Sequence, residues 1–281
     1  MIALITLWYN IAIQAMKNRL PFPILYEDRD VIVIDKPAGL LTTQTRAKET
    51  NTAEAWLNDY VRKGQSRSRV RVWLVHRLDR ETSGVMMFAK SEAVSEWFRA
   101  NWNELTEKTY LARVEGELSD ERGVFESWLL EDADGYKVRS VPPPRSSRPS
   151  QSRPHQPRLP KLARTEWRKV STEDGTTLVE VALKSGRKNQ IRVHFSEAGH
   201  PVVGDVKYGG QKASRLYLHS LRLRFKHPHT SEWCEFESPF PRTKHPSPAP
   251  STKHQARTTN HEPRTTNHEP RTSHARSLLR S

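Results

Sequence analysis

Cysteine and apolar residues are both scarce in this sequence, and each shortage excludes a class of protein. A single cysteine in 281 residues, Cys234, excludes an intramolecular disulfide framework and suits a reducing compartment. Apolar side chains make up only 35% of the chain, so we expect part of its length to lie outside any packed core. A glycine-rich phosphate loop, a metal-spaced cysteine set and a dinucleotide fingerprint are also missing, so none of these sites is predicted.

Long hydrophobic runs are missing as well. The first sixteen residues, MIALITLWYNIAIQAM, carry no charge, but they are short for a membrane-spanning helix of about 20 residues and are interrupted by Asn10 and Gln14. They also lack the positive start and the small-residue cleavage site of a secretory signal. We therefore expect no membrane role. Residues 1–20 are interpreted as an extension that is either helical or untranslated, with Met16 as the alternative start.

Positive charge is in excess, but it is unevenly distributed. The formal net charge of +14 favours a polyanionic partner such as nucleic acid. Residues 139–169 hold nine Lys and Arg against one acidic residue, and residues 243–281 hold seven against two, so the rest of the chain is close to neutral. Charge alone is therefore weak evidence for function.

Both basic tracts have the composition of disordered segments. SVPPPRSSRPSQSRPHQPRLPK has almost no apolar side chains and cannot offset the entropy of ordering. The C-terminal tract repeats the heptad TTNHEPR, whose proline excludes a coiled coil. We predict a disordered insert at 140–163 and a disordered basic tail at 242–281. Either these segments supply sequence-independent contacts to phosphates or they are expendable expansions.

Between these tracts, apolar periodicity predicts many strands and few helices. Helices are expected after Asn51, which has the spacing of a capping box with Glu54, across 91–105, and in a short segment closed by Gly199. The expected strands are 31–34, 72–75, 85–89, 110–116, 177–184 and 215–225. This order favours the α+β class, with one domain at 21–241 built on a large mixed, mainly antiparallel sheet with flanking helices.

One short motif orders charged residues in a way that a surface loop does not require. HRLDRETSG places Asp79 among arginines at the end of a predicted strand. A partly buried carboxylate stays ionised only beside a positive group. Arg77 and Arg80 are too close in sequence to be certain partners, whereas the distant stretch SGRKNQIRVHF offers Arg187 and Arg192. On spacing alone, a turn-capping aspartate fits equally well.

Four stretches resemble the RluA-type pseudouridine synthases in the order of their motifs. HRLDRETSGVMMFAK is similar to the family signature, in which His-Arg-Leu-Asp is followed after two residues by Thr-Ser-Gly. ILYEDRDVIVIDKPAGLL is similar to the opening motif, EKTYLARVEGEL to the tyrosine motif, and LKSGRKNQIRVHFSEAGHPVVGDVKYGG to the arginine motif. Together they cover most of residues 24–241, which is a far more specific signal than any single motif.

The resemblance implies a role for each matching residue. Asp79 matches the family's catalytic aspartate, which attacks the target uridine so that the glycosidic bond breaks and the base re-attaches through carbon. Tyr110 matches the active-site tyrosine that stacks on the base and is implicated in proton transfer. Arg192 matches the arginine that pairs with the aspartate. Arg77 matches a position that helps to displace the target base from its stack.

Three further residues of these motifs are candidates for contacting substrate or holding the loops that do so. His76 is expected to support its loop rather than to act as a base. Arg187 is expected to hold a loop or a phosphate, and Gln190 is placed among the substrate-binding residues. The resembled chemistry needs no cofactor and no metal.

The resemblance implies an isomerase that converts specific uridines to pseudouridine in ribosomal or transfer RNA. We expect a cytoplasmic monomer that acts on structured RNA, with no cofactor, metal or membrane involved. Residues 21–241 are expected to form the catalytic domain, without the small RNA-binding domain that many relatives carry before it. Asn189 stands where many relatives have histidine, a departure that leaves the nucleophile itself in place.

Two other functions stay open as alternatives. A catalytically idle RNA-binding or ribosome-assembly factor is one, although the joint presence of Asp79, Tyr110 and Arg192 argues against it. The other is a hydrolase that uses Asp79 with Glu81, although two residues this close in sequence need not have the defined distance between carboxyl groups that glycosidases require. A metal site is not predicted, because no tight ligand spacing is present among His194, His200, Asp205 and His219.

Overall fold

The computed structural model describes residues 19–45, 47–63, 65, 67–144 and 159–241, all within one unit, Met1–Ser247. The predicted extension and basic tail lie almost wholly outside these residues, as does most of the predicted insert. Residues 140–141 and 161–163, at the two ends of that insert, belong to strands rather than to a loop, so its predicted bounds of 140–163 were too wide. Within the described ranges, every helix is too short or too polar to cross a lipid bilayer.

Strands dominate the described residues. The helices are α2 (Ala53–Arg62), α3 (Glu92–Ala100), α4 (Trp102–Leu105) and α5 (Gln190–Glu197), with a 3-10 turn η1 (Val206–Tyr208). The strands are β1 (Ile24–Glu27), β2 (Val31–Lys36), β3 (Trp73–Leu74), β4 (Ser83–Ala89), β5 (Thr106–Glu115), β6 (Arg122–Glu131), β7 (Val138–Val141), β8 (Lys161–Glu173), β9 (Thr176–Leu183), β10 (Leu218–Lys226) and β11 (Trp233–Glu237).

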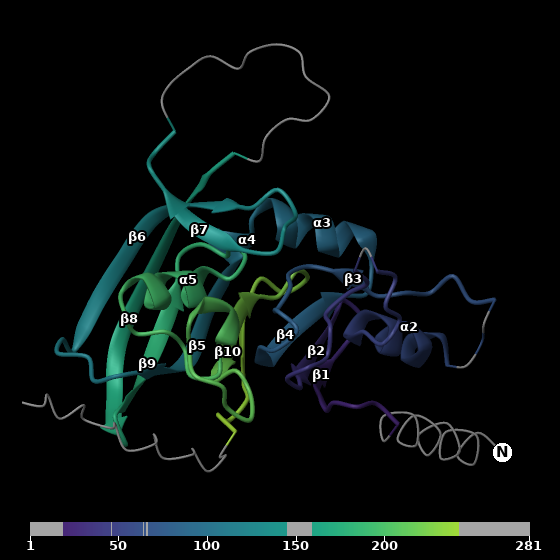
Figure 1. Ribbon diagram of the computed structural model, residues 1–281. Helices are drawn as coiled ribbons and strands as arrows, with labels where there is room; N and C mark the ends of the chain where they lie inside the picture. The colour runs from purple at the N-terminus through teal and green to yellow at the C-terminus, as the bar shows by residue number, and fades with distance from the viewer. Residues whose placement is uncertain (1–18, 46, 64, 66, 145–158, 242–281) are drawn as a thin grey trace, which may run out of the picture. The chain divides into compact units, whose positions relative to one another are not determined.

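The eleven strands of the described ranges form one sheet (Figure 1). Along it the order is β1-β2-β4-β10-β5-β9-β8-β6-β7, with β3 beside β4 and β11 beside β10. β4 and β10 pair in parallel, and the other pairs of these strands are antiparallel. The predicted α+β class with a mixed, mainly antiparallel sheet is therefore confirmed.

The two apolar runs at β2 and β4 are buried on both faces of the sheet. In β2, Ile32 faces one hydrophobic core and its neighbour Val33 faces the other. Helix α2 contributes Leu57 to the first core, and helix α3 contributes Phe98 to the second. Because both faces are covered, these strands carry continuous apolar runs instead of alternating with polar residues.

Two helix boundaries differ from the prediction. Helix α2 begins after Thr52, whose Oγ1 accepts a hydrogen bond from the Ala55 amide at 3.0 Å. Asn51, the predicted cap, instead accepts a hydrogen bond from the Trp56 indole at 2.9 Å, so that prediction was wrong by one residue. The single helix predicted over 91–105 is divided into α3 and α4, because Asn101 between them has non-helical backbone angles.

The parallel contact between β4 and β10 is short and close. Ser83 and Gly84 of β4 pair with His219 and Ser220 of β10. Gly84 has a φ of +109°, and a Cβ at this position would lie 2.2 Å from the Ser220 carbonyl oxygen. The Ser83 hydroxyl makes a hydrogen bond with Nδ1 of His219 at 2.7 Å. The Thr-Ser-Gly end of the sequence motif is therefore a junction between two parts of the sheet.

Replacing Gly84 with alanine should destabilise the protein strongly. The added methyl group would force β4 away from β10 and would hold a side chain at positive φ, so we expect the free energy of unfolding to fall by about 3 kcal/mol or more. Gly199→Ala is the matched control, because Gly199 also has positive φ (+83°) but a Cβ there meets nothing within 4 Å. The control should lose about 1–2 kcal/mol. Urea unfolding measures both, and equal losses would contradict the importance of the close approach.

Candidate active site

The loop before β4 carries the motif HRLDRETSG and forms part of a groove. Asp79 lines this groove, which has a volume of about 720 Å³, and also an adjoining pocket of about 400 Å³. This second pocket, called the inner cavity below, is as open to solvent as the groove. Arg77, Leu78 and Arg192 are likewise common to both walls. The Asp79 side chain is 23% exposed, so its carboxylate is accessible from the groove while most of the side chain is covered.

A buried lysine holds this loop in place. Lys36, at the end of β2, has no exposed surface, and its Nζ donates hydrogen bonds to the carbonyl oxygens of Pro37 (2.9 Å), Leu40 (2.7 Å) and Arg80 (3.1 Å). Burial lowers the pKa of Lys36 to about 8, although the negative charge of Asp79 acts in the opposite direction. The lysine thus ties the turn after β2 to the backbone just beyond Asp79.

Arg192 brings positive charge to Asp79, but its main partner is Asp205. Its Nε and Nη2 donate to the two Asp205 oxygens at 2.6 and 2.7 Å, and Nη1 donates to an Asp79 oxygen at 3.4 Å. The Arg192 and Asp205 side chains are 7% and 0% exposed. Burial disfavours the charged guanidinium, but the hydrogen bonds and charge of Asp205 outweigh it and raise the pKa of Arg192. The predicted Arg192–Asp79 contact is present, and the buried pair that supports it was not predicted.

Asp205 is fixed by a tight turn between α5 and η1. Its amide donates to the Val202 carbonyl at 3.0 Å, and its own carbonyl accepts from the Gly210 amide at 2.8 Å. Gly204 has positive φ (+82°), and a Cβ there would lie 1.9 Å from the Arg215 carbonyl oxygen. In the sequence, this turn is indicated by Gly204 directly before Asp205 in VVGDVKYGG, because only glycine fits such a close approach.

Tyr110 comes from β5, on the far side of the sheet junction from the Asp79 loop. It is 7% exposed and lines the inner cavity together with Asp79. Burial raises the pKa of Tyr110 to about 12, with Ser220 acting against the shift and the Asp79 charge adding to it. The phenol is therefore protonated at neutral pH. Apolar side chains complete this wall of the cavity, namely Leu183, Ile191 and Leu218.

Two arginines predicted to bind substrate line the inner cavity. Arg77 is exposed, and its guanidinium makes no hydrogen bond or ion pair with any residue that the structure describes. Arg187 donates through Nε to the Leu162 carbonyl at 3.1 Å, which leaves its terminal nitrogens available. Both side chains therefore offer hydrogen-bond donors to a ligand in the cavity.

Gln190, in contrast, uses its whole side-chain amide within the protein. Its Oε1 accepts from the Ser185 hydroxyl (2.8 Å) and the Arg187 amide (3.0 Å). Its Nε2 donates to the Arg164 carbonyl (3.0 Å) and the Thr165 hydroxyl (2.9 Å). This amide holds the 185–187 loop against β8. Gln190 also lines the inner cavity, so its contact with substrate stays a prediction.

His76 supports the loop, as expected from the sequence. Its Nε2 accepts a hydrogen bond from the Met87 amide at 3.1 Å, and its ring stacks on Trp102 with a centroid distance of 4.8 Å. Burial lowers the pKa of His76 to about 3, and the charge of Lys108 acts in the same direction. The imidazole is therefore neutral, and its Nε2 lone pair is occupied by the backbone of β4.

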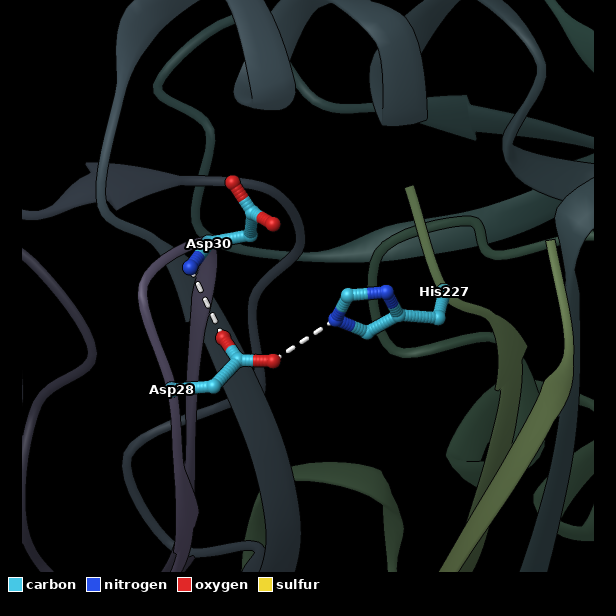
Figure 2. A group of neighbouring side chains, drawn as sticks. All are labelled: Asp28, Asp30 and His227. Carbon is cyan, nitrogen blue, oxygen red and sulfur yellow. Dashed lines mark hydrogen bonds and ion pairs between the residues drawn. The ribbon is translucent and has the colours of Figure 1, made fainter. Parts of the chain in front are cut away.

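A separate group of potential metal-ligating side chains lies at the β1–β2 turn and the end of β10. Figure 2 shows Asp28 between the backbone of Asp30 and the ring of His227. The Asp28 carboxylate accepts from the amides of Asp30 (2.7 Å) and Val31 (2.8 Å), from the Tyr26 hydroxyl (2.9 Å) and from His227 Nε2 (2.6 Å). These four hydrogen bonds use the acceptor sites of the Asp28 carboxylate. Asp28 therefore connects the β1–β2 turn to the end of β10.

The chain is similar in sequence and in fold to known proteins. The family profile described as RNA pseudouridylate synthase matches residues 30–197. The uncharacterized RNA pseudouridine synthase YjbO of Bacillus subtilis is 35% identical over 225 residues, which cover 79% of this chain and 73% of the relative. The dual-specificity RNA pseudouridine synthase RluA of Yersinia pestis is 33% identical over 211 residues, 73% of this chain and 92% of the relative. The solved structure of human RNA pseudouridylate synthase domain containing 4 has the same fold, with a TM-score of 0.63, 22% identity and coverage of 83% and 92%.

The fold, the groove and these similarities define an enzyme that acts on RNA. The chain belongs to the RluA-type family of RNA pseudouridine synthases, as its four motifs predicted. It is therefore an isomerase whose substrate is RNA.

Neutralising Asp205 should cost far more stability than neutralising a carboxylate that makes the same two hydrogen bonds to an exposed arginine. Asp205→Asn leaves a buried guanidinium without its main counter-charge, and we expect the free energy of unfolding to fall by about 3–5 kcal/mol. Glu180→Gln is the control. The two Glu180 oxygens likewise accept from Nε and Nη2 of one arginine, Arg168, both at 2.9 Å, but the Arg168 side chain is 63% exposed. The control should lose about 1 kcal/mol or less. Similar losses in chemical denaturation would contradict the dominant role of burial.

His76 should make the protein more sensitive to acid. Its pKa is lowered from 6.5 to about 3 in the folded state, so between these pH values the unfolded chain binds a proton that the native chain does not. Stability should therefore fall with falling pH, by up to about 1.4 kcal/mol per pH unit from this residue. His76→Gln keeps an acceptor for the Met87 amide but does not titrate. Urea unfolding from pH 7 to pH 4 should show a shallower slope for the variant, and equal slopes would contradict the assignment.

Proposed function

We propose that Asp79 is the nucleophile in the conversion of uridine to pseudouridine in structured ribosomal or transfer RNA. The observation that carries this proposal is the position of the Asp79 carboxylate. It lines both the groove and the inner cavity, beside Tyr110 and 3.4 Å from Nη1 of Arg192. Arg192 is itself held by Asp205, so the positive charge next to the nucleophile is preorganised.

The reaction exchanges one glycosidic bond for another. The bond from N1 of uracil to C1′ of ribose breaks, a bond from C5 to C1′ forms, the C5 proton leaves, and N1 gains a proton. No electrons are lost or gained overall, so the reaction needs no redox partner. The Asp79 carboxylate supplies the covalent attachment that separates bond breaking from bond making. Attack on the sugar and attack on the base ring both use this same group.

Tyr110 and Arg77 are assigned to substrate positioning. The Tyr110 ring forms one wall of the inner cavity, where a uracil would stack on it, and its protonated phenol is available for hydrogen bonding and proton transfer. Arg77 lies at the junction of groove and cavity with an unengaged guanidinium. Extruding a base costs a few kcal/mol, and a planar cation that fills the vacated stack offsets part of that cost.

The proposal also covers the domain, the location and the substrate of the enzyme. Residues 21–241 form the catalytic domain, and the protein acts as a cytoplasmic monomer. The proposed substrate is ribosomal or transfer RNA, and the choice between these two classes is left to the experiment below. Selection of the target uridine depends on the shape of the RNA and of the groove.

The test uses RNA that carries tritium at C5 of uridine. Ribosomal and transfer RNA pools are incubated separately with wild type, Asp79→Ala and Asp59→Ala, a control in which an exposed aspartate of α2 is removed. Wild type and the control should release tritium to water, whereas Asp79→Ala should release it about a thousandfold more slowly or not at all.

The outcomes separate the possible functions. The pool that responds identifies the substrate class. Release by Asp79→Ala at the wild-type rate would overturn the assignment of the nucleophile. An absence of release from wild type, with RNA binding intact, would favour a catalytically idle RNA-binding protein.

A further inference from the structure

A lysine occupies an apolar position of β5, next to the active site. Side chains alternate along this strand, and Lys108 lies on the same buried face as Tyr110 and Ala112. Lys108 is 7% exposed, and its ammonium nitrogen has less than 1 Å² of accessible surface. Lysine is almost never buried to this extent unless it is paired.

The Lys108 ammonium has no hydrogen-bond partner among the residues that the structure describes. The Trp102 ring lies 5.4 Å from it, and the loop at Gly186 covers it, since a Cβ on Gly186 would be 3.9 Å from Nζ. Burial lowers the pKa of Lys108 to about 8, so the group is still mostly protonated at neutral pH. An unpaired buried cation is a destabilising feature, and a bound anion would compensate it.

A cavity of about 330 Å³ lies against this lysine. Arg77 and Arg187 contribute two further cations to its lining, and no carboxylate of the described residues lines it. The catalytic groove differs in this respect, because Asp79, Glu81 and Asp205 are among its lining residues. Three positive groups without a negative one define an anion-binding cavity.

The cationic cavity adjoins the inner cavity. Tyr110, Arg77 and Arg187 line both, so a ligand in one is separated from a ligand in the other by little more than these side chains. The lining of the cationic cavity also includes Trp102 and His76, whose rings stack on each other. The cavity is therefore placed to receive a part of the substrate that is covalently linked to the target uridine.

We propose that this cavity binds a backbone phosphate of the RNA, adjacent to the target nucleotide, and that Lys108 is a substrate-binding residue. The proposal deepens the proposed function, because it names the group that fits beside the flipped uridine. A phosphodiester supplies the negative charge and the acceptor oxygens that the three cations lack. Charge-assisted hydrogen bonds to phosphate are among the stronger polar contacts in proteins.

The test measures binding of a short oligouridylate to the full-length chain over a range of salt concentrations, which requires no turnover. Lys108→Met removes the charge with little change of volume, and we expect affinity to fall about tenfold. The slope of log affinity against log salt should become shallower by about 0.7, as expected for one lost phosphate contact on a single strand. Lys108→Arg should retain most of the affinity.

Lys226→Met is the matched control. Lys226 is also a partly buried lysine of the sheet, with Nζ 5.6 Å from the Trp233 ring, but it lines neither the groove nor the two cavities. Affinity and salt slope should be unchanged in this variant. A second variant, Gly186→Ala, places a methyl group beside Lys108 without removing charge, and we expect it to weaken binding as well.

A thermal melt adds a readout that a purely structural lysine would not give. If Lys108 is kept for RNA, Lys108→Met should melt at the same or a higher temperature than wild type while binding more weakly. Single methylphosphonate linkages in the oligouridylate locate the contact, since the affected linkage should weaken wild type but not Lys108→Met. Unchanged affinity and slope in a folded Lys108→Met would overturn the proposal. The outcome is separate from the nucleophile, because loss of tritium release in Asp79→Ala does not depend on this cavity.

Discussion

The close approach of β4 to β10 is the contact on which the active site depends. The loop with Asp79 leads directly into β4, whereas Tyr110 and Arg192 belong to elements on the other side of β10. Gly84 allows the two strands to meet, because any side chain there would overlap the Ser220 carbonyl. The glycine that ends the sequence motif therefore acts at a distance from the chemistry. It sets the separation between Asp79 and the groups that surround it.

Three buried cations around this junction are compensated to different degrees. Lys36 satisfies its ammonium with three backbone carbonyls, and it holds a loop. Arg192 is neutralised by Asp205 and still directs one nitrogen to Asp79. Lys108 has no partner among the described residues. The number of partners limits what each cation can do. A cation whose donors are all paired within the protein can only stabilise the fold, whereas an unpaired cation can still bind an anionic ligand.

Much of the fold was predictable because its central strands have strong local signals. The apolar runs at β2 and β4 are buried on both faces, so hydrophobicity alone located them. The strands β6 and β8 were not predicted, because their exposed faces carry many charged residues. In addition, the Pro/Arg-rich tract between β7 and β8 has the composition of a disordered segment. The cap of α2 was placed one residue too early, since Asn and Thr are both good caps and the choice depends on backbone geometry.

The candidate site was predictable only where a residue type and a motif coincided. Asp79, Tyr110 and Arg192 were named from their motifs, and the structure brings them to one cavity. Asp205 was considered only as a possible metal ligand, because its pairing with Arg192 depends on a turn that sequence spacing does not reveal. The hydrogen bonds that Gln190 makes within the protein were not predictable for the same reason, since a buried amide and a substrate-binding amide look identical in sequence.

The place of β10 in the sheet also has a consequence for biosynthesis. This strand lies between β4 and β5, yet it follows both in the chain, and its partner residues Ser83 and His219 are 136 positions apart. A nascent chain that already displays Asp79 and Tyr110 still lacks the strand that joins them. Such long-range pairing is slow and forms late. The cavity that Asp79 and Tyr110 share therefore cannot be completed until residues 218–226 have been synthesised.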